Sequence, residues 1–94
     1  GPYAVAVAPD GAHVYVAARF DHAILAFARN AFDGTLTFAG TVVDGALGVD
    51  GIGGVSALTV SPDGAQLYAA GNFDNAVALF ARDGSSGLLT FVEA

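Results

Sequence analysis

The sequence has no cysteine, no methionine and no tryptophan, and only three of its 94 residues are lysine or arginine. Without cysteine there is no disulfide framework, no thiolate nucleophile and no cysteine-based metal site. The three cations stand against nine acidic residues, which gives a net charge of −6. So few cations cannot neutralise many phosphates, so the composition argues against nucleic acid and against anionic membrane surfaces as partners.

Long apolar runs are also absent, although 54% of the residues are hydrophobic. Gly, Asp, Asn or Arg interrupts every window, and no segment approaches the roughly 20 apolar residues of a transmembrane helix. No basic and apolar leader opens the chain, so no export signal is visible, and the sequence does not indicate a cellular compartment. The chain starts with Gly rather than Met, as expected of a processed or excised chain.

What the sequence does contain is a repeat. "APDGAHVYVAARFD" begins at Ala8 and "SPDGAQLYAAGNFD" at Ser61, and a shift of 53 lays residues 1–41 over 54–94 without a gap. Of these 41 paired positions, 19 are identical. A period of this size indicates a repeat architecture. The identical pairs include Pro9/Pro62, Asp10/Asp63, Gly11/Gly64, Tyr15/Tyr68, Phe20/Phe73, Asp21/Asp74, Phe27/Phe80, Arg29/Arg82 and Leu36/Leu89.

Each copy predicts four short antiparallel strands. In the first copy they are residues 3–8, 13–18, 23–29 and 35–41, separated by turns rich in Gly, Asp and Asn. A helix is the alternative for the segment "HAILAFAR", but eight residues between turn signals are too few to favour a helix over a strand. Strands such as "VYVAA" are apolar on both faces, so each sheet should be covered on both sides. Four-stranded sheets stacked face to face in a ring are β-propeller blades.

The segments "VAPDGAHVYVA" and "LTVSPDGAQLYAA", each followed by "FD", "AxxxFAR" and "LTF", resemble the YVTN-type and lactonase-like β-propeller repeats of bacterial proteins. The resemblance covers both copies. It implies an all-β fold with blade one at residues 1–41, a connector at 42–53 and blade two at 54–94. The family includes a lactonase of sugar-phosphate metabolism and many surface and binding proteins with no known reaction.

Two blades would leave one apolar face bare on each side. From strand spacing and rise, each face has about 500 Å² of accessible surface, which corresponds to on the order of 10 kcal/mol of unrealised burial. Three or four identical chains can cover these faces head to tail, closing a ring of six or eight blades. Alternatively the chain is part of a longer propeller, since no second connector follows Ala94. For the chain as given we favour the homo-oligomer.

In propellers the outer-to-inner connectors and the second-to-third strand loops share one rim, where ligands commonly bind. The resemblance therefore implies six rim candidates for a small-molecule or protein ligand: Arg19, Asp21, His22, Asn72, Asp74 and Asn75. For the two aspartates we favour a structural role, in which the carboxylate accepts backbone N–H bonds and the preceding Phe packs between blades. A cation beside a neutral imidazole, as in Arg19 and His22, suits an anionic ligand or acid–base chemistry; solvated loop polarity is the alternative.

Five further positions receive structural interpretations. Asp44 and Asp50 could offer calcium ligands, but the calcium-loop pattern is not met and a Gly-rich turn is favoured, so no metal site is predicted. Arg29 and Arg82 are expected to be structural, with Asp33 or Asp83 as partners. His13 is expected to be exposed at the start of a strand.

No catalytic apparatus and no cofactor site stand out. Ser and Thr lack a convincing His–acid partnership, and no Gly-rich phosphate loop leads into a helix. The sequence therefore favours a non-catalytic scaffold or binding module. The alternatives are a lactonase-like hydrolase, with its site in the central channel or on the top rim of an assembled propeller, and a purely structural array element.

Overall fold

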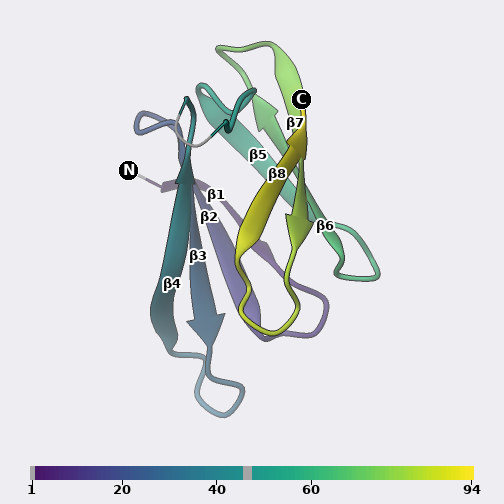
Figure 1. Cartoon of the computed structure of the whole chain (residues 1–94). Coiled ribbons are helices and arrows are strands. Elements are labelled where there is room, and N and C mark those ends of the chain that lie inside the picture. The colour runs from purple at the N-terminus through teal and green to yellow at the C-terminus, as the bar shows by residue number, and fades with distance from the viewer. Residues whose placement is uncertain (1, 46–47) are drawn as a thin grey trace.

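Eight strands form two separate four-stranded sheets in the computed structural model, which describes residues 2–45 and 48–94 (Figure 1). Each sheet is a simple antiparallel meander, ordered β1-β2-β3-β4 and β5-β6-β7-β8. The expected all-β class with two four-stranded meanders is confirmed. Gly1 and residues 46 and 47 of the predicted connector lie outside the described residues. The strand bounds are β1 Pro2–Val7, β2 His13–Ala18, β3 Ala23–Arg29, β4 Leu36–Val43, β5 Val55–Val60, β6 Gln66–Gly71, β7 Ala76–Arg82 and β8 Leu89–Glu93.

In the first copy the second and third predicted strands coincide with the observed ones, the first lies one residue earlier than predicted, and the fourth begins one residue later and ends two residues later. β4 continues to Val43, two residues into the segment expected to be connector, because Ile24 and Ala23 of β3 extend the pairing to Val42 and Val43. "HAILAFAR" is a strand rather than a helix. No helix capable of spanning a membrane occurs in the described residues.

The repeat extends to the irregularities of the sheets. The register between the first two strands shifts between Pro2 and Ala4, and again 53 positions later between Val55 and Ala57. The register between the third and fourth strands shifts after Ala26 and after Leu79, which are also equivalent. Bulges bend and twist a strand, so both sheets carry the same bend at the same places.

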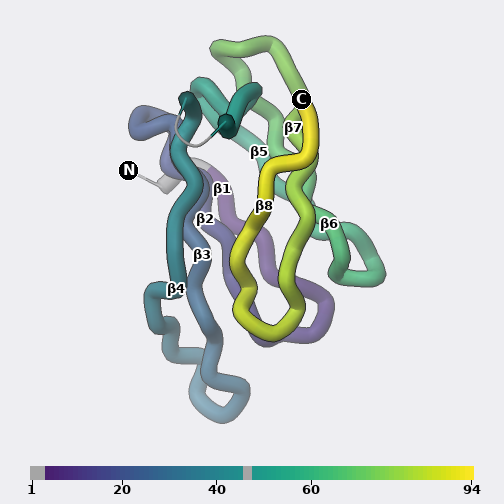
Figure 2. The backbone as a smooth tube through the Cα atoms, viewed as in Figure 1, coloured from purple at the N-terminus to yellow at the C-terminus, as the bar shows by residue number. Residues whose placement is uncertain are grey.

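The hydrophobic core lies between the two sheets. Figure 2 shows the two meanders side by side, and the most extensive contacts between strands of different sheets join β5 to β1 and β2. The first sheet contributes alanines together with two large, fully buried side chains, Tyr15 and Ile24. The second sheet contributes Leu67 and Phe80, which are also fully buried, and the connector adds Ile52. The small alanines let the sheets approach closely, as their frequency in the strands predicts.

Candidate functional site

The rim is formed by three segments that come together at one end of the sheets. They are the β2–β3 turn (19–22), the β6–β7 turn (72–75), and residues 44–45 and 48–53 of the connector together with Gly54. They are joined by backbone hydrogen bonds. Asp44 N–H donates to the carbonyl of His22 at 2.8 Å, and Phe73 N–H donates to the carbonyl of Gly53 at 2.9 Å. The connector therefore links the turn of one sheet to the turn of the other.

Gly53 and Gly54 form the centre of the rim. The Gly53 N–H donates to Oδ2 of Asp74 at 2.8 Å, and the next N–H, of Gly54, donates to Nδ1 of His22 at 2.7 Å. A Cβ on Gly53 would lie 2.6 Å from Oδ1 of Asp74, and one on Gly54 would lie 2.6 Å from the Phe73 ring. Only glycine at these two positions allows the backbone to pass this close to the side chains of Asp74 and Phe73.

An aromatic ring lies beside the two basic groups of the rim. The Phe73 ring packs edge-on against His22 with centroids 5.7 Å apart, and the Arg19 guanidinium lies 5.4 Å from the Phe73 centroid. Because Nδ1 of His22 accepts a hydrogen bond, the ring is neutral in this contact and its proton is on Nε2. His22 can thus donate a hydrogen bond to a ligand, while Arg19 supplies positive charge.

The other three rim candidates contribute no side-chain hydrogen bond to this centre in the described residues, although the Asn72 N–H donates to the carbonyl of Gly54 at 3.1 Å. Asn72 and Asn75 line a hollow of about 290 Å³ on the second sheet, together with Val77 and other residues of β6 and β7. Asp21 borders an apolar groove of about 520 Å³ on the first sheet. His22 and Asn75 share a left-handed backbone with φ of 52°, a conformation in which Asn and His are enriched. The left-handed backbone is therefore a second, local reason for His at position 22 and Asn at position 75.

Three carboxylates of the rim lie close together. One oxygen each from Asp44, Asp50 and Asp74 falls within 4.8 Å of the others. Each carboxylate accepts a backbone N–H. Asp44 accepts from Ile52 at 3.3 Å and Asp50 from Gly51 at 2.9 Å, and Asp74 accepts from Gly53 as described above. Sequence reasoning paired Asp44 with Asp50 but did not place Asp74 with them, because only the folded connector brings the second turn to the first two acids.

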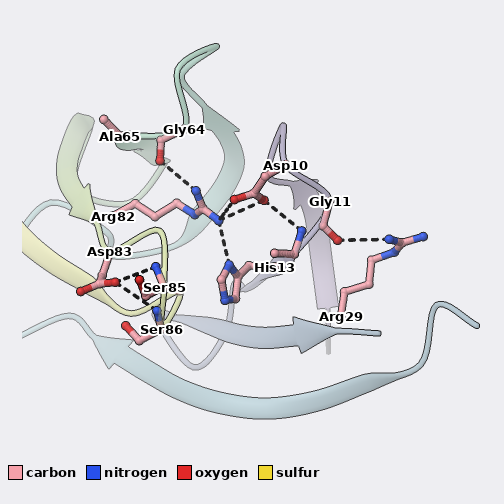
Figure 3. Close-up of polar contacts among 12 residues, drawn as sticks. Asp10, Gly11, His13, Arg29, Gly64, Ala65, Arg82, Asp83, Ser85 and Ser86 are labelled. Atoms are coloured by element: carbon pink, nitrogen blue, oxygen red, sulfur yellow. Dashed lines mark hydrogen bonds and ion pairs between the residues drawn. The ribbon is translucent and has the colours of Figure 1, made fainter. Parts of the chain in front are cut away.

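The opposite end of the sheets holds a buried polar cluster that sequence reasoning missed. Arg82 is 8% exposed and His13 only 4%. Figure 3 shows the Arg82 guanidinium between the two sheets: Nη2 lies 3.2 Å from Oδ2 of Asp10 and 2.7 Å from Nδ1 of His13, and Nη1 donates to the carbonyl of Gly64. Arg82 also donates through Nε to the Tyr15 hydroxyl at 2.8 Å.

Two expectations are corrected by this cluster. His13 is buried rather than exposed, because the second sheet covers the start of β2. Arg82 pairs with Asp10 rather than with Asp33 or Asp83, because its side chain crosses to the other sheet. Burial, reinforced by the Arg82 charge, lowers the pKa of His13, and burial raises the pKa of Tyr15. The hydrogen bond from Ala12 N–H, followed by contact with Arg82, lowers the pKa of Asp10.

Arg29, the counterpart of Arg82, keeps only part of these contacts. Its Nη1 donates to the carbonyl of Gly11 at 3.1 Å, as Arg82 does to Gly64. The side chain is exposed. In Figure 3 it points away from the Arg82 cluster. The signal that could have found the cluster is the repeat itself, since both arginines, both turn aspartates and both tyrosines recur.

Comparison with known proteins places the chain near bacterial lactonases in structure. No protein-family model matches the sequence, and neither does any curated protein. A periplasmic gluconolactonase of Pseudomonas aeruginosa is 32% identical, with a TM-score of 0.84 over 99% of this chain. A protein of Bacteroides fragilis described provisionally as a 6-phosphogluconolactonase is 27% identical over 98%, with a TM-score of 0.83. A Lactobacillus plantarum protein is 27% identical over 99%, with a TM-score of 0.86. The chain spans 24%, 26% and 27% of the Bacteroides, Pseudomonas and Lactobacillus structures.

Proposed function

We propose that the chain is a two-blade unit of a lactonase-like β-propeller, with blades at residues 1–41 and 54–94 and the connector between them. The observation that carries this proposal is the likeness to the Pseudomonas gluconolactonase, which extends over 99% of the chain at 32% identity. The YVTN-type repeat fits the same proposal, because the matched residues occupy the turns and packing positions of each blade. The proposed reaction is hydrolysis of a sugar lactone.

The rim supplies the chemistry that such a ligand needs. In lactone hydrolysis, water adds to the ring carbonyl and the C–O bond of the ring breaks, which gives a hydroxy acid. Nε2–H of His22 is a donor for the carbonyl oxygen, where negative charge develops during attack. Arg19 would attract an acidic substituent of the sugar. Asp21 is in the same turn but borders the apolar groove on the first sheet, so it is given no part in this step.

A non-catalytic binding module is the second candidate, and one observation favours it. The carboxylates of Asp44, Asp50 and Asp74 and Nδ1 of His22 all accept backbone N–H bonds within the rim. Groups committed in this way hold the connector in place and are less available for proton transfer.

Titrimetric detection of acid release from glucono-δ-lactone, at fixed pH, tests the two candidates. We expect turnover above the spontaneous rate, reduced at least 10-fold by Arg19→Ala or His22→Ala. The matched control is Asn72→Ala, at the position equivalent to Arg19 but outside the rim centre, and it should keep most of the activity. Binding of the lactone without turnover would favour the module, and neither binding nor turnover would contradict both.

A further inference from the structure

The contact between the two sheets uses opposite faces of the repeat. In each sheet we call the face that carries Tyr15, or its counterpart Tyr68, the front face, and the opposite face the back face. The first sheet contacts the second with its front face, which carries Tyr15 and Ile24. The second sheet contacts the first with its back face, which carries Leu67 and Phe80. Because the strands repeat at 53 positions, the back face of the first sheet and the front face of the second are the two faces left without a partner. This is the pattern of a head-to-tail contact rather than a two-fold one.

Equivalent residues differ in exposure because one copy is covered and the other is not. Tyr15 is fully buried in the front face of the first sheet, whereas Tyr68 in the front face of the second is 40% exposed. On the back faces, Val5 and Val7 are 61% and 55% exposed, whereas their counterparts Leu58 and Val60 pack against the core. Each of the two uncovered faces thus carries the residues that, in the other copy of the repeat, form the contact between the sheets.

The polar groups of the contact between sheets also recur at equivalent positions of the two faces that the internal contact leaves uncovered. In the covered contact, Arg82 binds Asp10 and Tyr15, and the Tyr15 hydroxyl donates to the carbonyl of Gly87 at 2.6 Å. The equivalent groups are divided between the two free faces. The first sheet carries exposed Arg29 and Gly34, and the second carries exposed Asp63 and Tyr68. The free faces therefore bear opposite charges at equivalent places.

We propose that the front face of the second sheet binds the back face of the first sheet of a second copy of this chain, in the geometry of the internal contact. Arg29 of the second copy then pairs with Asp63 and donates to the Tyr68 hydroxyl, as Arg82 does to Asp10 and Tyr15. The groove bordered by Val5, Leu25 and Phe27 receives the front face of the neighbour. Repetition of this contact closes a ring of three or four chains.

The area involved is sufficient for a specific contact. Two faces of about 500 Å² each, from strand spacing and rise, bury about 1,000 Å², which is about the minimum area of a biological interface. With a charge of −6 on each chain, attraction between copies has to come from apolar burial and from local pairing of Arg29 with Asp63. This inference concerns assembly and stands whether or not the protein hydrolyses lactones.

The test is light scattering after size exclusion across a dilution series, with charge reversals on the two uncovered faces. We expect a mass of three or four times 9.3 kDa for the unaltered chain. Arg29→Asp and Asp63→Arg should each shift the dissociation midpoint to at least 10-fold higher concentration, and the double variant should restore it. Asp50→Arg is the matched control, because it makes the same change in net charge as Asp63→Arg at the opposite end of the sheets. It should assemble at least as well as the unaltered chain.

Two results would overturn the proposal. A folded particle of 9.3 kDa at every concentration would show that a second copy does not cover these faces, leaving the next repeat of a longer chain as their occupant. If neither single charge reversal shifts the dissociation midpoint, or if the double variant fails to restore it, the contact between chains lies elsewhere. Circular dichroism of each variant checks folding, because Asp63 accepts hydrogen bonds from Ser61 and Ala65 within its turn and Arg29 donates to the carbonyl of Gly11.

Discussion

The hydroxyl of Tyr15 in β2 donates a hydrogen bond of 2.6 Å to the carbonyl of Gly87, 72 residues later in the β7–β8 turn. The same oxygen accepts from Nε of Arg82 at 2.8 Å, and the tyrosine is fully buried. One phenol thus joins the two sheets through both of its hydrogen-bonding capacities. A group engaged in this way leaves two buried partners unsatisfied when it is removed.

Tyr15→Phe should therefore lower the free energy of unfolding by about 1–3 kcal/mol. Tyr68→Phe is the control within the same chain, since its hydroxyl is on the exposed front face of the second sheet. It should change the unfolding free energy by less than about 0.5 kcal/mol at high dilution. Denaturant unfolding followed by circular dichroism measures both, and equal losses in the two variants would contradict the role of Tyr15.

Gly87 is expected to tolerate no side chain. A Cβ there would collide with the His13 ring, and the backbone has a left-handed φ of 77°. Gly45 has a φ of 83° but open space around its Cβ position. Gly45→Ala should cost about 1 kcal/mol for the backbone conformation alone. Gly87→Ala should cost about 1–3 kcal/mol more, because the overpacked sheets must separate.

Thermal denaturation of the two glycine variants at matched concentration gives this comparison. The difference between them isolates the contact between sheets, because the two positions have similar left-handed φ angles of 77° and 83°. Similar melting temperatures would mean that His13 rotates away at little cost.

Stability should fall as the pH drops below about 6.5, the ordinary histidine pKa. Burial, then the Arg82 charge, lowers the pKa of His13, and the facing carboxylates of Asp10 and Asp83 only partly oppose this. The unfolded chain therefore takes up a proton before the native state does, so stability is complete above the unfolded pKa and is lost as the pH falls through the native one.

His13→Gln checks this assignment, because glutamine occupies the equivalent position 66. It should remove most of the loss between pH 7 and 5 in a series of urea unfolding curves. A pH profile that His13→Gln leaves unchanged would assign the loss to another group.

The rim distinguishes two aspartates that are equivalent in sequence. Asp74→Ala removes the acceptor for the Gly53 N–H and should destabilise the chain by about 1–3 kcal/mol. Asp21→Ala alters an exposed carboxylate and should stay within about 0.5 kcal/mol. Chemical denaturation of both variants decides whether the repeated Phe-Asp pair has a structural role in both blades or only beside the connector.

The local features of this protein could be predicted from the sequence alone. Strand lengths, the Pro-Asp-Gly turns and the two meanders follow from near-neighbour preferences, and the shift of 53 shows that both copies form the same sheet. The structural role expected for Asp74 also follows from turn chemistry, and its contact with Gly53 agrees with it. Six rim candidates could be named, although their spacing alone did not show which of them come together.

The tertiary structure decided which copy of each repeated residue is covered. His13, Tyr15 and Arg82 are buried while Gln66, Tyr68 and Arg29 are not, although the local sequence treats each pair almost alike. The same holds for Asp74, which joins Asp44 and Asp50 only because the connector folds back between the turns. Burial depends on which face of one sheet meets which face of the next. That relation is set by contacts about 70 residues apart, as from Asp10 to Arg82, which no local pattern encodes.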